Sequence, residues 1–403
     1  MEVEEKGPMV DRARDAAALG ARRPRRGPAA AGESIDVQVY SDLDAVPDAI
    51  AAALARAGER SFFASPAWSR IVLRTAGSPA DRPRLYAARS GGRVLATLIV
   101  RERERAGPLK LRLVTSPSRG LDAFANGPQL DAEDGAAGVH AIISAMLRAV
   151  PPVHVFRFEC LEPGSRECRA LLDALRRRHM LVRTFADRFF TCSEDVEGLT
   201  FDAYLQRRSP DMRAFIDRQA GALAASGRGR FELVTGGPEL AAALVDYALV
   251  DLQSWKAQEP YPDCLARLLD TAARAGVLRL GLLYIDDRPA AAQIWIVSGG
   301  RATMWRSRFA RQFALQSPGT VLTFEMIRHV LTVDAPSVTE FGPGDDPGRP
   351  QWLDRRHERI GVAVFNPHTA KGWGAAARHV IGIAAGSARR RLGAVRRRIL
   401  AGG

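Results

Sequence analysis

The chain of 403 residues contains only four cysteines, and none of them forms a CxxC pair or another spacing typical of metal ligands. A disulfide-stabilised secreted protein or a cysteine-based zinc site would need more cysteines in closer pairs. We therefore expect all four cysteines to be reduced and buried as small hydrophobic side chains, namely Cys160, Cys168, Cys192 and Cys264. We also expect no bound metal.

Long hydrophobic runs are also missing. A helix that spans a bilayer needs about 18 or more apolar residues. The most apolar stretch, 277–298, is interrupted by Asp286, Asp287 and Arg288. The first residues, MEVEEKG, are acidic where a secretory signal would be basic and then apolar. The sequence thus predicts a cytoplasmic protein without a transmembrane segment.

Nucleophilic hydrolase signatures are absent as well. The seven histidines are scattered, and no GxSxG motif occurs. Nothing in the sequence therefore indicates a catalytic triad.

The composition is that of a globular protein, with 46% hydrophobic and 26% charged residues, and its length allows two domains. The formal net charge of +13 is uneven: after Glu358 there are nine Lys and Arg and no acid, so the rest of the chain carries +4. Residues 1–33 are rich in Ala, Arg, Gly and Pro, which predicts a disordered basic arm. Residues 372–403 predict a basic amphipathic tail, suited to an anionic membrane surface or to RNA; the alternative is a solvated helix that packs loosely on its own domain.

The first half, residues 34–195, alternates strands and helices. We expect strands at 35–40, 84–89, 93–102, 109–115, 153–160 and 181–192, and helices at 43–57, 134–150 and 166–179. Ser65 and Pro66 predict the capped start of a further helix. An acidic stretch that contains a glycine, 193–199, marks the expected domain boundary.

The second half, residues 196–371, repeats this order. Helical patterns cover 201–225, broken at Ser209-Pro210, then 238–256 and 262–275, around a strand at 230–235. Two alternating strands flank the turn at Asp286–Pro289, and a third follows Gly299-Gly300. Ser317-Pro318-Gly319-Thr320 opens a helix, with Ser317 as the expected N-cap. Strands at 338–341 and 361–366 complete the unit.

This order resembles the core of the GNAT acyltransferases. The sequences of several motifs are similar to those of the FemAB-like branch, in its CelD-like or BioF-two-like group. The motifs are Trp255-Lys256, Ala292-Gln293-Ile294-Trp295, Ser317-Pro318-Gly319-Thr320, Gly344-Asp345-Asp346-Pro347, Trp352 and Arg355-Arg356. The resemblance implies an α/β (α+β) fold of tandem GNAT-like domains, with mixed, mostly antiparallel sheets flanked by helices. It also implies transfer of an acyl group, most simply acetyl, from acetyl-CoA or another acyl-CoA to an amine. The CelD-like resemblance implies an amine on a sugar or polysaccharide precursor.

The helix start at Ser317 is the candidate anion site, because a helix N-terminus presents free N–H groups to phosphate. Gly319 would let a ligand approach the backbone, and Thr320 belongs to the same turn. A simple structural cap is the competing interpretation. GNAT enzymes usually carry a loop of the form Arg/Gln-x-x-Gly-x-Gly/Ala here, and this chain lacks the first glycine.

Six further residues are candidates. Gln293 and Arg306, on neighbouring predicted strands beside the expected cleft, would bind the donor's carbonyl and phosphate; the alternative is a solvent-facing pair. Trp255 and Lys256, expected at a helix end, would bind substrate, although a terminal lysine also complements the helix dipole. Trp352 and Arg356 would form a wall of the site, and Trp352 could equally be core packing.

Asp345 and Asp346 lie in a Gly/Pro/Asp loop at a strand end. The resemblance favours Asp345 as the general base or as the group that holds the acceptor amine, with Asp346 at the substrate. A plain Asp-Pro turn is the alternative.

Two other functions remain open. FemAB-type relatives use aminoacyl-tRNA, and the basic tail could hold tRNA. The chain could also be a non-catalytic GNAT-fold scaffold, in peripheral contact with the inner membrane face through its C-terminal helix.

Overall fold

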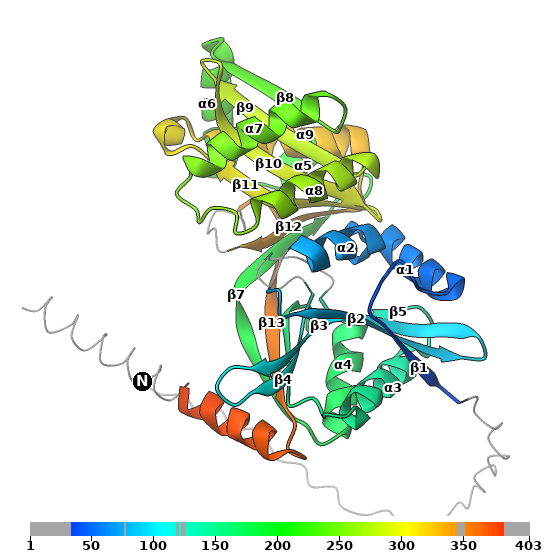
Figure 1. Cartoon of the computed structure of the whole chain (residues 1–403). Coiled ribbons are helices and arrows are strands. Elements are labelled where there is room, and N and C mark those ends of the chain that lie inside the picture. The colour runs from blue at the N-terminus through cyan, green and yellow to red at the C-terminus, as the bar shows by residue number, and fades with distance from the viewer. Residues whose placement is uncertain (1–33, 76–77, 118–120, 122–125, 345–350, 383–403) are drawn as a thin grey trace, which may run out of the picture. The chain divides into compact units, whose positions relative to one another are not determined.

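The computed structural model describes residues 34–75, 78–117, 121, 126–344 and 351–382, and Figure 1 shows their arrangement. The first half contains these elements: β1 (Asp36–Tyr40), α1 (Asp48–Arg60), α2 (Pro66–Thr75), β2 (Arg82–Ser90), β3 (Arg93–Ala106), β4 (Leu111–Thr115), β5 (Gln129–Leu130), α3 (Gly135–Arg148), β6 (Val155–Leu161), α4 (Arg166–Arg177) and β7 (Leu181–Asp195).

The second half follows a similar succession, with two extra helices at its start and, in the described residues, no counterpart of β5 or α4. Its elements are α5 (Phe201–Gln206), α6 (Pro210–Ala225), β8 (Gly229–Val234), α7 (Glu239–Leu252), α8 (Pro262–Arg274), β9 (Leu278–Ile285), β10 (Arg288–Ser298), β11 (Arg301–Phe309), the 3-10 turn η2 (Arg311–Gln316), α9 (Pro318–His329), η3 (Val330–Asp334), β12 (Val338–Gly344) and β13 (Arg355–Phe365). A last helix covers 370–382 in the described part of the chain.

The strands form one sheet in the order β1-β2-β3-β4-β6-β13-β7-β12-β11-β10-β9-β8, and β5 pairs with β3 beside it. This order is symmetric about its centre. Each half supplies an antiparallel meander of four strands, then a parallel neighbour, and the final strands of the two halves, β7 and β13, lie together in the middle. The tandem GNAT-like fold and the mostly antiparallel sheet flanked by helices are therefore confirmed.

The central strands join the halves because each pairs beyond its own half. The long β7 contacts β12 near its end and β13 along most of its length, while β13 also pairs with β6. Strand β13 begins at Arg355, six residues before the predicted start. Its charged first residues resemble a loop, but Arg359 is buried and bonded to Glu162 and Glu340, so the strand tolerates it. The predicted boundary at 193–199 overlaps the end of β7, and the domain limits stay a prediction.

Several local predictions are confirmed. The Ser65 hydroxyl accepts a hydrogen bond from the Trp68 N–H at 3.1 Å, as expected of a cap. The four cysteines are all buried and outside disulfide bonds. Helix α7, however, ends at Leu252 instead of residue 256, which places Trp255 and Lys256 in the following loop. In the part of the chain that the structure describes, no helix has the length and hydrophobicity needed to cross a membrane.

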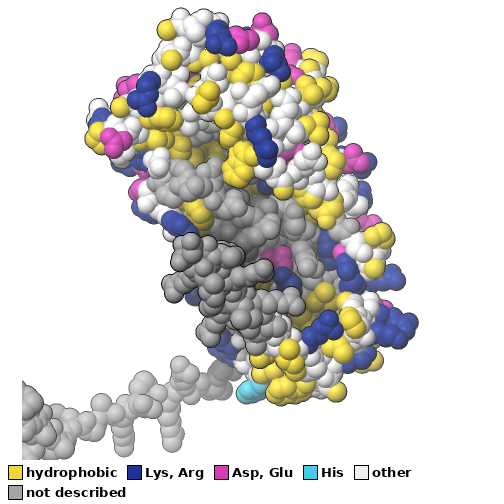
Figure 2. All heavy atoms as spheres, turned by 90° about the vertical axis from the view of Figure 1, so that its left-hand side faces the viewer, with side chains coloured by type: hydrophobic (Ala, Val, Ile, Leu, Met, Phe, Trp, Pro, Cys, Tyr) yellow, Lys and Arg dark blue, Asp and Glu magenta, His cyan; other side chains and the backbone are white. Residues whose placement is uncertain are grey.

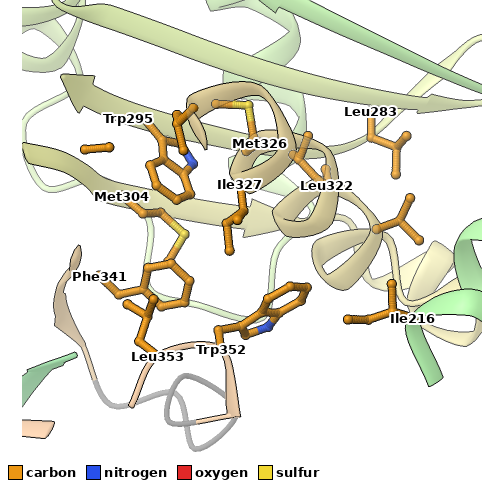
Figure 3. Close-up of a cluster of buried hydrophobic side chains, with 14 of the residues drawn as sticks. Ile216, Leu283, Trp295, Met304, Leu322, Met326, Ile327, Phe341, Trp352 and Leu353 are labelled. Carbon is orange, nitrogen blue, oxygen red and sulfur yellow. The ribbon is translucent and has the colours of Figure 1, made fainter. Parts of the chain in front are cut away.

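Helices cover both faces of the second-half meander. On one face, α9 lies over the strands, and its Leu322, Met326 and Ile327 meet Trp295 and Met304 (Figure 3). On the other face lie α7, α8 and an aromatic group from the first half that includes Trp68, whose ring centroid is 5.2 Å from that of Trp305. Strand β11 is thus fixed from both sides, and this positions the site described next.

Candidate active site

The parallel strands β11 and β12 pair only at their beginnings. Arg301–Met304 lie opposite Val338–Phe341, and among the described residues β11 has no partner on that edge from Trp305 to Phe309. Strand β12 instead continues along β7, where Gly344 lies opposite Phe190. The two strands therefore part, and within the described chain the backbone groups of β11 at the gap have no ladder partner.

A pocket of about 230 Å³ opens beside this gap. Twelve residues line it: Lys256, Met304, Ser307, Phe309, Ala314, Ser317, Pro318, Gly319, Thr320, Thr323, Phe341 and Trp352. Five of them were predicted as site residues from the sequence, namely Ser317, Gly319, Thr320, Lys256 and Trp352. Lys256 is the only charged residue among the lining residues that the structure describes, so the pocket favours an anionic ligand.

A β-bulge decides which side chains of β11 face this pocket. Ile294 pairs with Arg306 and Trp295 with Met304, so Trp305 is the extra residue. The bulge turns Trp305 and Arg306 toward the α7 face and returns Ser307 and Phe309 to the pocket. Without the bulge, Arg306 would lie on the same face of β11 as Met304 and would point to the pocket. Because of the bulge, it points to the opposite face.

Arg306 belongs to a buried ionic network on the opposite face. Its Nε lies 2.8 Å from Glu259 Oε1, and its Nη2 donates to the Leu121 carbonyl at 2.8 Å. Glu259 also binds Arg308 at 3.0 Å, and Arg308 binds Asp251 at 2.6 Å. Burial, followed by the charge of Glu259, raises the pKa of Tyr247 well above its usual value. The Arg306 guanidinium is therefore engaged in holding the fold.

The start of α9 differs from a simple serine cap. Ser317 has a left-handed backbone, φ 48° and ψ 48°, and its side chain makes no capping hydrogen bond, which contradicts the predicted cap. Its carbonyl instead accepts from the N–H groups of Thr320 and Val321. Pro318 has no N–H, so Gly319 carries the one N–H of this first turn with no backbone acceptor in the described chain. That group is available to a ligand.

Gln293 fixes this helix start to the sheet. Its side chain is fully buried, and its amide nitrogen donates to Thr323 Oγ1 at 2.7 Å, while its amide oxygen accepts from Trp295 Nε1 at 2.9 Å. The Thr323 hydroxyl donates in turn to the Gly319 carbonyl at 2.8 Å. Gln293 thus does not line the pocket; it positions the turn that does.

Trp352 and Lys256 form two walls of the pocket. The Trp352 carbonyl accepts from the Tyr204 hydroxyl at 2.5 Å and from Arg208, whose guanidinium binds Glu194 at 2.6 Å. In Figure 3 the Trp352 indole lies below α9, opposite Ile216. Lys256 Nζ donates to the Ser307 carbonyl at 3.3 Å.

The remaining predicted residues lie outside the pocket lining. Trp255 is 48% exposed, and its ring lies 5.7 Å from Lys256 Nζ. Arg356 lies over the Phe190 ring at 4.0 Å and pairs with Glu358 at 3.2 Å. Asp345 and Asp346 fall outside the described residues, directly after the end of β12.

Sequence reasoning missed Ser307, Phe309 and Thr323, which line the pocket. The orientation of Ser307 and Phe309 depends on the bulge, which the sequence does not reveal. Thr323 has no sequence feature that distinguishes it from other residues of its helix. In the described ranges, no group of three His, Cys, Asp or Glu is placed to hold a metal ion.

Comparison with known proteins connects this geometry to a family. A model described as "Acetyltransferase (GNAT) domain" matches residues 210–348. No curated protein matches the sequence. A solved structure titled "Crystal structure of FemX" is 10% identical, with a TM-score of 0.53, over 74% of this chain and 90% of that one.

Two further solved structures overlap most of the chain. One is a tandem GNAT protein from the clavulanic acid biosynthesis pathway, 15% identical, with a TM-score of 0.46, over 83% of this chain and 99% of that one. The other is L-PGS from Bacillus licheniformis, 11% identical, with a TM-score of 0.46, over 84% of this chain and 97% of that one.

Proposed function

We propose that this chain, in which residues 210–348 match a GNAT acetyltransferase domain and whose fold is similar to that of FemX, is an acyltransferase. It would transfer an acyl group, most simply acetyl, from a CoA thioester to an amine. The observation that carries this proposal is the parting of β11 and β12 beside the start of α9. Such a gap lets an extended thioester lie along the free edge of β11.

The chemistry needs little from side chains. The acceptor amine attacks the thioester carbonyl, a C–N bond forms, the C–S bond breaks, and the amine proton passes to a base while the thiolate leaves. N–H groups on the free edge of β11 would polarise the carbonyl and hold the developing oxyanion. Positioning in a closed gap would supply much of the rest. Asp345 remains the proposed base, because in the sequence it directly follows β12, one of the two strands that part.

The donor site would use Gly319, Thr320 and Lys256. The Gly319 N–H and the helix dipole favour an anionic group, and the Lys256 ammonium adds a positive charge. A pocket of 230 Å³ is smaller than the 300–1,000 Å³ usual for a whole small ligand, so it suits the acyl end of a larger donor. Acceptors with an amine on a sugar or polysaccharide precursor follow from the CelD-like resemblance.

Isothermal titration with acetyl-CoA and with CoA tests the donor. Gly319→Leu should abolish binding, because a Cβ at this position lies 3.5 Å from Phe309 and a longer side chain would extend into the pocket. Gly221→Leu is the matched control, since that helical glycine has open space around it. If wild type binds neither ligand at high micromolar concentration, the CoA proposal fails.

One observation favours a second donor, aminoacyl-tRNA. The N–H groups of Phe313 and Ser317 donate to the carbonyls of Ala310 and Ala314, so the loop before α9 does not offer them to a pyrophosphate. This agrees with the missing glycine of the usual CoA loop, and FemAB-type resemblance implies tRNA donors. Binding of tRNA should weaken steeply with salt, and truncation after Gly382, which removes six arginines, should reduce it. A donor affinity that does not change with salt concentration would count against this alternative.

A further inference from the structure

A second hollow lies between strands of the first half, β13 and the helix at 370–382, on the face of the sheet that α3 and α4 do not cover. It has a volume of about 730 Å³. Its floor consists of inward side chains from four adjacent strands: Leu111 and Leu113 of β4, Val155 of β6, Ala363 and Phe365 of β13, and Phe185 of β7. Leu113 pairs with Val155, and Val155 pairs with Phe365, so these apolar groups form a continuous surface. The volume suits a sizeable apolar ligand.

The helix at 370–382 covers part of this floor and is itself two-sided. Ala375, His379 and Gly382 line the hollow at helical spacing. Away from it, Trp373 is 56%, Val380 63% and Ile381 67% exposed. Figure 2 views the molecule from the side on which this helix lies in Figure 1, and it shows hydrophobic side chains gathered at the lower end beside Lys and Arg. Exposed apolar groups next to an apolar hollow favour an apolar partner.

The rim of the hollow is positively charged. Arg157, Arg183 and Arg378 line it, and no carboxylate is among the lining residues of the described chain. Arg157 pairs with Glu159 at 2.7 Å, whereas Arg183 and Arg378 have no carboxylate within ion-pair distance in the described ranges. His379 Nε2 is buried and has no hydrogen-bond partner there. An anionic group would complement this rim.

We propose that this surface binds an anionic membrane: the hollow takes one acyl chain of an anionic lipid, the three rim arginines hold the lipid headgroup, and Trp373, Val380 and Ile381 enter the interface. The sequence after Glu358 contains Lys and Arg but no Asp or Glu, so the adjoining chain is positively charged like the rim. The inference goes beyond the acyl transfer proposed above and does not depend on it.

The first test is sedimentation of the full-length protein with vesicles of phosphatidylcholine, alone or mixed with phosphatidylglycerol. Wild type should sediment only with the mixed vesicles. A double variant, Val380→Asp with Ile381→Asp, should weaken binding at least about tenfold. The matched control places Asp at Val245 and Leu252 of α7, which are 61% and 64% exposed, and should bind as wild type does.

The second test asks whether a lipid chain enters the hollow. In a Trp373→Phe background, which keeps the five other tryptophans, Leu113→Trp places an additional fluorophore on the floor, and its signal is the difference between the two proteins. Leu111→Trp is the alternative should the first variant not fold. Phosphatidylglycerol with brominated chains should quench the new tryptophan. A tryptophan that stays unquenched while the protein is vesicle-bound would overturn the acyl-chain site.

Truncation after Gly382 separates the surface from the distal arginines. The truncated protein should keep the quenching of the floor tryptophan, with weaker vesicle affinity. The proposal is overturned if truncation removes all vesicle binding while the Val380/Ile381 variant binds normally, or if the surface binds RNA and no vesicle.

Discussion

Replacement of Gln293 by methionine should destabilise the protein and loosen the donor site together. Methionine has a similar volume and fills the same space, so no large cavity results. It cannot accept from Trp295 Nε1 or donate to Thr323 Oγ1, the contacts at 2.9 and 2.7 Å. Both residues are buried, so water cannot replace the lost partners.

The expected cost follows from these contacts. A buried indole N–H left without an acceptor costs about 1–3 kcal/mol. The Thr323 hydroxyl still donates to the Gly319 carbonyl, so the loss of the hydrogen bond that Thr323 accepts from Gln293 costs about 1 kcal/mol. The sum, about 2–4 kcal/mol, is a large part of the typical 5–15 kcal/mol that holds a domain folded.

Urea unfolding measures this cost as a lower midpoint with an unchanged slope. Gln253→Met is the control, since that glutamine is exposed and should cost less than about 0.5 kcal/mol. Isothermal titration on the folded variant should show weaker donor binding, because the Gly319 turn has lost its anchor. A destabilisation as small as that of the control would refute the stabilising role of the Gln293 hydrogen bonds, and an unchanged donor affinity would refute the role of Gln293 in positioning the Gly319 turn.

Three other predictions concern separate parts of the molecule. Arg306→Met should cost about 2–4 kcal/mol, because Glu259 loses one buried partner, while donor affinity measured by titration stays at the wild-type value; a selective loss of donor affinity would return Arg306 to the binding site. Asp345→Asn should lower kcat by about 10²–10⁴-fold with little change in KM, and intact turnover would remove its assigned role. Burial, then the charges of Lys371 and Arg112, lower the pKa of His154, so the folded state binds fewer protons than the unfolded chain below about pH 6.5. Stability should therefore fall as pH decreases from about 7 to 5, and His154→Gln should flatten that slope in urea unfolding; an identical slope would contradict the assignment.

Most helices and strands could be predicted from the sequence because turn residues and apolar periodicity lie within each element or next to it. Asp286 and Asp287 both adopt positive φ in the turn between β9 and β10, and Gly299 and Gly300 do so in the next turn. Alternating apolar residues between these turns predicted the three strands. The order of these elements was compatible with the tandem fold that the resemblance to the FemAB-like branch implied.

Long-range pairing could not be predicted in the same way. Nothing local to β13 shows that it lies between β6 and β7, or that Arg359 is neutralised there by glutamates distant in sequence. The pocket shows the same limit at smaller scale. Ser317, Gly319 and Thr320 were found because a helix start is visible in sequence, whereas one inserted residue at Trp305 exchanged the sides of Arg306 and Ser307.

Hydrogen–deuterium exchange with saturating acetyl-CoA tests the central claim most directly, that the donor lies between β11 and β12. Exchange should slow in the segment from Trp305 to Thr320, and the corresponding strand of the first half, β4, should be unaffected. Protection confined to the first half, or equal rates throughout β11 and the start of α9 in a donor-bound protein, would contradict the account.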